Sequence, residues 1–190
     1  MNVGTENSFM RKIAIANSAI VLLLMINPAL TFAIQHSDDW IKYNSKEGRY
    51  NVSVPGEPSL DSQEATSANG EKFTQYQATV RSGKTIYMIG YFDYPPSTVF
   101  AFDAARDRMM DGVKATLLSE RSISLGGAPG REIRLLTKIL DEDYVVIARF
   151  YDANQRVYVI QFIAPKSDET GLEQRAARYF DSFQMVKTAQ

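Results

Sequence analysis

Apolar and polar residues alternate along the chain from Trp40 onward. A period of two residues is typical of β-strands that bury one face. The alternation predicts a short strand at Trp40–Tyr43 and a second over residues 50–54. The second strand places three apolar side chains on one face, namely Tyr50, Val52 and Val54. These three residues are therefore expected to lie in the core.

Pro55-Gly56 ends the second strand with turn residues. Residues 57–70 are polar and small, which predicts a loop. Six longer strands are then predicted, over residues 71–80, 84–93, 116–125, 131–140, 143–152 and 156–165. Short polar links join most of them, so neighbours are expected to pair antiparallel, with Asn154 as the left-handed residue of the last turn.

The strand at 84–93 is apolar on both faces. One face carries Ile86, Met88 and Phe92, and the other carries Tyr87, Ile89 and Tyr91. A strand covered on both sides lies in the middle of a sheet, with other elements packed above and below it.

Two segments have helical spacing. After Pro95-Pro96, a helix is predicted with Ser97 or Thr98 as its cap and an apolar face of Val99, Phe102, Met109 and Val113. A second amphipathic helix is predicted within residues 167–186, capped by Ser167 or Asp168. Antiparallel strands with two separated helices indicate an α+β sandwich that covers both faces of one sheet.

The first 33 residues have a different pattern. Arg11 and Lys12 precede an apolar segment that Asn27 and Pro28 interrupt, and small residues lead up to Ala33. This order is typical of a signal peptide, with cleavage expected after Ala33. The alternative is an uncleaved anchor, but a span needs about 20 mostly apolar residues. The expected division is a signal peptide (1–33), a flexible tail (34–37), one domain (38–186) and a C-terminal tail (187–190).

Composition narrows the function classes. The 190 residues carry a net charge of −1 and no cysteine. Without a basic excess, the chain does not resemble a nucleic-acid-binding protein. The expected mature chain can bury enough surface to fold without disulfides, although a periplasmic or otherwise secreted location would permit them.

Three features of the sequence are candidate binding or catalytic sites. The segment LGGAPGREI (125–133) joins two predicted strands, which favours a tight turn over a phosphate-binding loop, because the latter needs a helix N-terminus. Asp141-Glu142-Asp143 is expected to be a solvated hairpin tip, since a calcium loop needs six or more oxygens at fixed spacing. The only histidine, His36, falls in the expected tail.

These residues do not include the side chains of a common catalytic site. A serine or cysteine nucleophile needs a positioned base, and zinc needs histidine or cysteine ligands. We therefore predict that the protein is not an enzyme, with no catalytic residue, no metal site and no cofactor. A glycan hydrolase that uses a carboxylate pair is the enzymatic alternative. Five tyrosines on central strands are expected to pack in the core, and an aromatic groove for a ligand or peptide is the other option: Tyr87, Tyr91, Tyr144, Tyr151 and Tyr158.

Four segments in this order resemble bacterial PsbP-like domains: GRYNVSVPGEP, LGGAPGREI, RFYDANQRVYVIQFIAP and FDSF. That family shares its fold with the PsbP extrinsic subunit of photosystem II and with a Ran-binding nuclear import factor. The resemblance covers roughly residues 38 to 186 and implies an α-β-α sandwich around a mainly antiparallel β-sheet. It also implies a binding or accessory role, and no functional residue transfers by position.

The expected function is therefore that of an exported accessory or assembly domain. Its partner is expected to be a protein or a small apolar ligand, and not a nucleic acid. Contact with a membrane is expected only if the N-terminal segment is retained, in which case the domain would be tethered.

Overall fold

The computed structural model describes residues 40–66, 70–95 and 98–186. Ten strands and two helices make up this part of the chain. In chain order they are β1 (Ile41–Ser45), β2 (Tyr50–Val54), β3 (Ser59–Thr66), β4 (Lys72–Ser82), β5 (Thr85–Asp93), α1 (Phe102–Val113), β6 (Thr116–Leu125), β7 (Ala128–Ile139), β8 (Glu142–Ala153), β9 (Arg156–Pro165), α2 (Glu169–Ser182) and β10 (Gln184–Met185).

The strands form two antiparallel sheets. The large sheet has the order β3-β4-β5-β9-β8-β7-β6, and the small sheet has the order β1-β2-β10. All ten residues of β9 are buried, as are all residues of β5 except Asp93. This confirms that the strand predicted at 84–93 lies in the middle of a sheet, because a strand buried on both faces needs cover on both sides.

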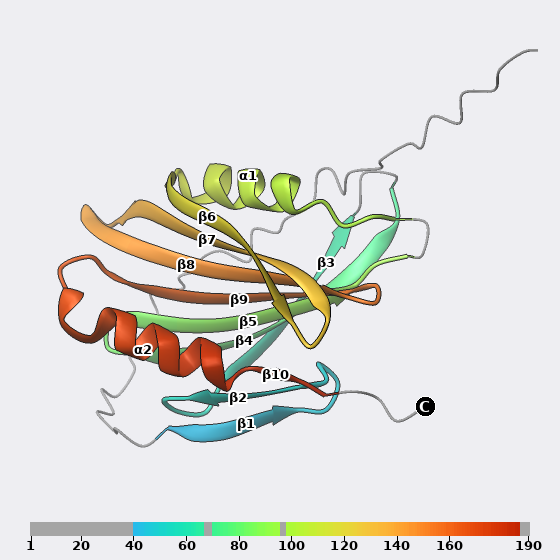
Figure 1. Cartoon of the computed structure of the whole chain (residues 1–190), viewed down its shortest axis with the longest axis horizontal. Helices are drawn as coiled ribbons and strands as arrows, with labels where there is room; N and C mark the ends of the chain where they lie inside the picture. The colour runs from blue at the N-terminus through green and yellow to red at the C-terminus, as the bar shows by residue number, and fades with distance from the viewer. Residues whose placement is uncertain (1–39, 67–69, 96–97, 187–190) are drawn as a thin grey trace, which may run out of the picture.

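Helix α1 covers one face of the large sheet, and α2 covers the other face together with the small sheet (Figure 1). Each face has its own hydrophobic core. Ile86 and Met88 point to the α1 side, whereas Tyr87 and Ile89 point to the α2 side, as their alternation predicts. The structure is thus an α+β sandwich around a mainly antiparallel sheet, which confirms the expected fold class.

The small sheet packs through the predicted face of β2. Tyr50, Val52 and Val54 are all buried in the core on the α2 side. The Ser53 backbone N–H donates to Ser182 Oγ at the end of α2, over 2.8 Å. The small sheet and α2 therefore form one layer on this face.

The loop predicted at 57–70 is wrong for most of its length. Residues 59–66 form β3, an edge strand that pairs with β4 in a continuous register from Ser59–Thr79 to Thr66–Lys72. Six of its eight residues are exposed, and Ala65 is its only buried one. A strand solvated on both faces lacks the apolar alternation on which sequence interpretation depends.

Both helix predictions need correction at their ends. Helix α1 starts at Phe102 after Ala101 rather than at a Ser97 or Thr98 cap; Thr98 is buried in the preceding loop, and Ser97 lies outside the described residues. Val99 is exposed and precedes the helix. Asp168 is the N-cap of α2 but makes no side-chain capping bond. Helix α2 ends at Ser182, because the next residues pair with β2 as β10.

The hairpin turns follow their predicted chemistry. Asn154 adopts the left-handed conformation (φ 51°), which confirms its expected place in the β8–β9 turn. The β7–β8 turn is one residue earlier than expected, at Leu140-Asp141, so that Glu142 already belongs to β8. Neither helix in the described part of the chain is long and apolar enough to span a bilayer.

Several predictions fall on residues that the structure does not describe. These are the signal peptide (1–33) with its cleavage after Ala33, the tail (34–37) with His36, and the C-terminal residues 187–190. They stay predictions.

Candidate functional site

A groove of about 610 Å³ lies between the turn of the small sheet and the edge of the large sheet. One wall comes from residues 43–47 and Tyr50, on β1, β2 and the turn between them. The other comes from the large sheet, with residues 60–62 of β3, residues 76–78 of β4, and Tyr91 of β5. The groove therefore brings together four segments that are distant in the sequence.

Tyrosine rings form the floor of this groove. Tyr76 stacks on Tyr91 with a centroid distance of 4.9 Å, and Tyr50 meets the Tyr91 ring edge-on at 6.3 Å. Tyr76 is 39% exposed and Leu60 is 66% exposed, although both are large apolar side chains. Stacked aromatic rings with an accessible face offer apolar contact area at low entropic cost.

Arg156 anchors the wall of the groove to its floor. Its guanidinium donates to both carboxylate oxygens of Asp93, each over 2.6 Å, and to the backbone carbonyl of Glu47 over 2.7 Å. The same guanidinium lies 4.8 Å from the centre of the Tyr91 ring. Because one buried cation contacts the turn, the sheet and the floor, the shape of the groove is preorganised.

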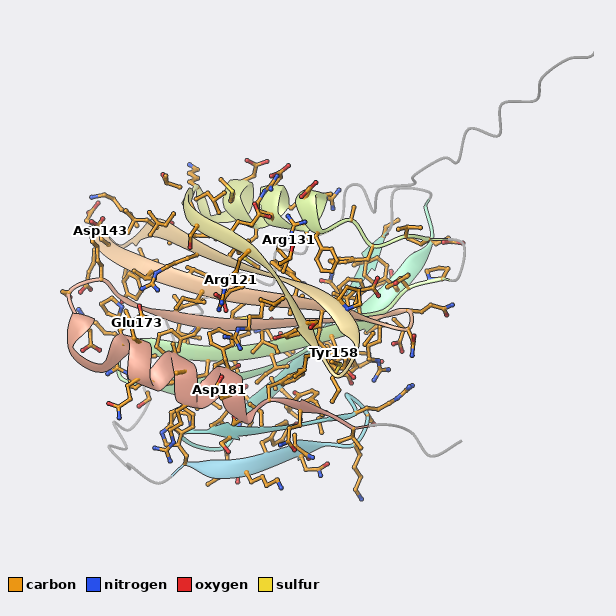
Figure 2. All side chains as sticks on the ribbon, viewed as in Figure 1. Arg121, Arg131, Asp143, Tyr158, Glu173 and Asp181 are labelled. Atoms are coloured by element: carbon orange, nitrogen blue, oxygen red, sulfur yellow. The ribbon has the colours of Figure 1, made fainter. Side chains whose placement is uncertain are left out.

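Tyr158 adds a second anchor, close to the small sheet (Figure 2). Its hydroxyl donates to the carbonyl of Gly48 over 2.8 Å. Gly48 is required beside it, because a Cβ at that position would lie 2.4 Å from the buried ring of Tyr50. The GRYNVSV segment is therefore structural: its glycine and tyrosine fix the turn that forms one wall.

The floor tyrosine is neutral at physiological pH. Burial raises the pKa of Tyr91 to about 12, against the opposing influence of the Arg156 charge. Hydrogen bonds from Arg156 hold the pKa of Asp93 below its usual value. The groove therefore presents the neutral ring of Tyr91 beside the ion pair of Arg156 and Asp93, a surface suited to recognition by stacking.

The large sheet also carries two ionic clusters outside the groove. Glu120 accepts from Arg131 and Arg106 on the α1 side, where Arg131 lies beside the helix (Figure 2). Glu132 accepts from Arg121 over 2.7 Å and from Arg149 over 2.6 Å. Burial alone would raise the pKa of Glu132, but these hydrogen bonds outweigh it and lower that pKa.

We expect the carboxylates of Asp93, Glu120 and Glu132 to make the folded protein less stable in acid. The pKa values of Asp93, Glu120 and Glu132 are all lowered in the folded protein, so the unfolded chain binds more protons as the pH falls. Their contribution is complete above the unfolded pKa of about 4 and is lost as the pH falls through the folded values. We expect the urea midpoint to fall steeply below about pH 5, and less steeply in the Glu132→Gln variant. A midpoint that stays constant down to about pH 3 would contradict this.

The glycine-rich segment 125–133 is a turn. Gly126 and Gly127 have positive φ angles of 58° and 89° and connect β6 directly to β7, which confirms the tight turn. Gly130 permits close strand packing, because a Cβ there would lie 2.5 Å from the carbonyl oxygen of Phe150. No helix N-terminus stands at this position, and that is the element a phosphate-binding loop needs.

The acidic segment 141–143 is the tip of the β7–β8 hairpin, as predicted. Glu142 pairs with Lys84 over 2.6 Å, and Asp143 lies 3.6 Å from Lys138. Within residues 40–66, 70–95 and 98–186, no three histidine or acidic side chains gather in an arrangement that could hold a metal ion.

All five tyrosines singled out on the central strands are buried, so their expected packing role is confirmed. Three residues at the groove were not predicted from the sequence: Leu60, Tyr76 and Arg156. Leu60 lies in a segment interpreted as a loop, and Tyr76 has the same alternation as a core residue. Arg156 carried one available signal, since it is the only charged residue in β9, a strand that is apolar apart from Gln161.

No family model matches the chain, and no curated protein is similar to it in sequence. Solved structures do match. Cyanobacterial PsbP (CyanoP) from Synechocystis sp. PCC 6803 superposes with a TM-score of 0.57 at 10% identity, over 84% of this chain and 99% of that one. A Pseudomonas aeruginosa protein of unknown function gives 0.39 at 12% identity, over 80% and 99%. LpqN of Mycobacterium tuberculosis, involved in cell envelope biogenesis, gives 0.34 at 12% identity, over 70% and 87%.

The superposition on CyanoP covers nearly all of that protein. At this level of identity the match concerns the fold and transfers no functional residue. It agrees with the resemblance carried by the four sequence segments. The described domain has the PsbP-like fold.

Proposed function

We propose that this protein is an exported, non-enzymatic binding or accessory domain that recognises its partner through the tyrosine groove. The single observation that carries the proposal is the accessible surface of Leu60 and Tyr76 above a rigidly anchored floor. A soluble domain gains nothing for its own stability by exposing a stacked ring and a leucine side by side, and exposed apolar patches of this kind mark interaction sites.

The N-terminal sequence pattern supports the same proposal. The N-terminal pattern of Arg11, Lys12, an apolar segment and Ala33 favours export to the periplasm or beyond. If the segment is retained instead, the same groove would act from a membrane-tethered domain. An accessory role is compatible with the PsbP-like fold. The expected partner of the protein is another protein or a small apolar ligand.

The test is affinity capture from the envelope fraction of the producing cell, with three forms of the protein as bait. The wild type is compared with the double variant Leu60→Ser/Tyr76→Ser and with Leu118→Ser, a matched change at an exposed leucine on β6, the opposite edge of the sheet. We expect one species to be retained by the wild type and Leu118→Ser but lost from the double variant. Equal retention by all three forms, or by none above background, would refute the role of the groove.

One observation favours the enzymatic alternative. Two acidic residues, Glu47 of the turn and Asp61 of β3, are among the residues that line the groove. A glycan hydrolase needs such a pair. Release of sugars from a glycan panel by the purified protein, abolished by Glu47→Gln and by Asp61→Asn, would replace the binding proposal. We expect no release above that of a buffer blank.

A further inference from the structure

Strand β3 is a free edge of the large sheet. Among the described strands it pairs only with β4, through eight consecutive register positions without a bulge. An edge strand directs one row of backbone N–H and C=O groups away from its sheet. β3 therefore offers an uninterrupted template to which another strand can pair.

The opposite edge of the same sheet is protected. Strand β6 has an irregular register between Leu117 and Ser119, and its Glu120 and Arg121 are held in ionic clusters with β7. A register irregularity of this kind hinders pairing with a further strand. β3 has no bulge, no proline and no lysine within its bounds. Only one of the two edges is thus left suitable for strand addition.

The free edge and the groove are continuous. Leu60 and Ser62 of β3 line the groove next to Tyr76 of β4. Side chains of a strand alternate between the two faces of a sheet. A strand added to β3 would therefore place every second side chain on the same face of the sheet as Leu60. Side chains on that face can reach the exposed ring of Tyr76.

Charge determines which strand fits. β3 carries Asp61 and Glu64, both exposed, and Glu64 contacts the exposed Lys72 over 2.7 Å. Antiparallel pairing with a second copy would set Asp61 opposite Asp61 when it is centred on that residue, and Glu64 opposite Glu64 when it is centred on that one. Like charges placed opposite each other destabilise a strand pair, whereas opposite charges stabilise it. The edge therefore disfavours itself and favours a basic strand.

We propose that β3 is a strand-addition site that takes an extended, basic segment of a partner protein, with the apolar side chains of that segment entering the tyrosine groove. Backbone hydrogen bonds to β3 supply affinity; the groove selects apolar side chains on one face of the added strand, and Asp61 selects basic side chains on the other face. The inference rests on the proposed function, because it names the occupant of the same groove.

The test uses the full protein and synthetic peptides of the length of β3. One peptide alternates valine and lysine, a second alternates valine and glutamate, and a third is the valine–lysine peptide with N-methylated amides at alternate positions. We expect the valine–lysine peptide to bind at least about tenfold more tightly than either of the others, and to slow hydrogen exchange at the amides of β3.

Two protein variants separate the contributions. Asp61→Lys/Glu64→Lys is expected to weaken binding of the valine–lysine peptide by about tenfold at low salt. Asp111→Lys/Asp181→Lys, the same charge change at exposed positions on the two helices, is expected to leave it unchanged. Leu60→Ser/Tyr76→Ser is expected to weaken binding without altering the preference for lysine over glutamate.

The outcomes distinguish the two proposals. Equal binding of the N-methylated peptide, with no slowing of exchange in β3, would overturn strand addition while the groove could still bind apolar ligands. Peptide binding and β3 protection that persist in Leu60→Ser/Tyr76→Ser would instead remove the groove from the site. Equal affinity for the lysine and glutamate peptides would overturn the basic character of the partner.

Discussion

Replacing Tyr50 with alanine is expected to lower the free energy of unfolding by about 3–5 kcal/mol, the usual cost of removing a fully buried aromatic ring. Tyr50 is 1% exposed and is the residue of β2 that joins the two sheets. Its ring contacts four others, Tyr43, Tyr91, Tyr158 and Phe183. The cavity would open between the small sheet and the large sheet.

The measurement is urea unfolding followed by circular dichroism, with Tyr76→Ala as the matched control. Tyr76 is an aromatic residue of the same type that is 39% exposed, so its loss is expected to cost about 1 kcal/mol or less. Hydrogen exchange adds a local readout, since the amides of β1 and β2 are expected to lose protection first in Tyr50→Ala. Equal midpoints for the two variants would show that Tyr50 does not hold the layers together.

The core could be predicted from the sequence because burial follows a simple period. The alternation in residues 84–93 assigns each side chain of β5 to its own side of the sheet, and the structure confirms both sides. Tyr50, Val52 and Val54 behaved in the same way in β2. Where one face of an element is apolar, a residue's position in the repeat determines which layer it joins.

The features that escaped prediction are those without a buried face of their own. β3 is solvated on both sides, so its strand conformation comes from pairing with β4 rather than from its own pattern. β10 consists of two residues whose conformation depends on β2. Pairing of this kind is a tertiary property, and no local repeat in the sequence encodes it.

The candidate site was hidden for a related reason. Each of its walls is an ordinary turn or strand, and Arg156 and Tyr158 of β9 hold one wall in place through the carbonyls of Glu47 and Gly48. The segments that carry the resemblance to PsbP-like domains turn out to be structural: Gly48, Gly130 and Asn154 fix turns or close approaches. Leu60 and Tyr76 lie outside those segments. The two residues on which the proposed binding surface depends thus lie outside the segments that carry the resemblance in fold.

The ion pair of Arg156 and Asp93 is expected to behave asymmetrically when either partner is removed. The Arg156 side chain is 8% exposed, whereas that of Asp93 is 60% exposed. Asp93→Ala therefore leaves a buried guanidinium without its carboxylate, which is expected to cost about 3 kcal/mol. Arg156→Met leaves a carboxylate that water can reach and preserves much of the apolar packing. It is therefore expected to lower the free energy of unfolding by about 1–2 kcal/mol.

The double variant Asp93→Ala/Arg156→Met tests this argument. The double variant no longer contains the buried, unpaired guanidinium of Arg156. It is therefore expected to be more stable than Asp93→Ala alone, although it carries one more substitution. Urea midpoints of the four proteins at pH 7 give the coupling energy directly. If the double variant lost the sum of the two single costs, Arg156 would not depend on Asp93. The preorganised link between the wall of the groove and its floor would then have to come from Tyr158 and its bond to Gly48 instead.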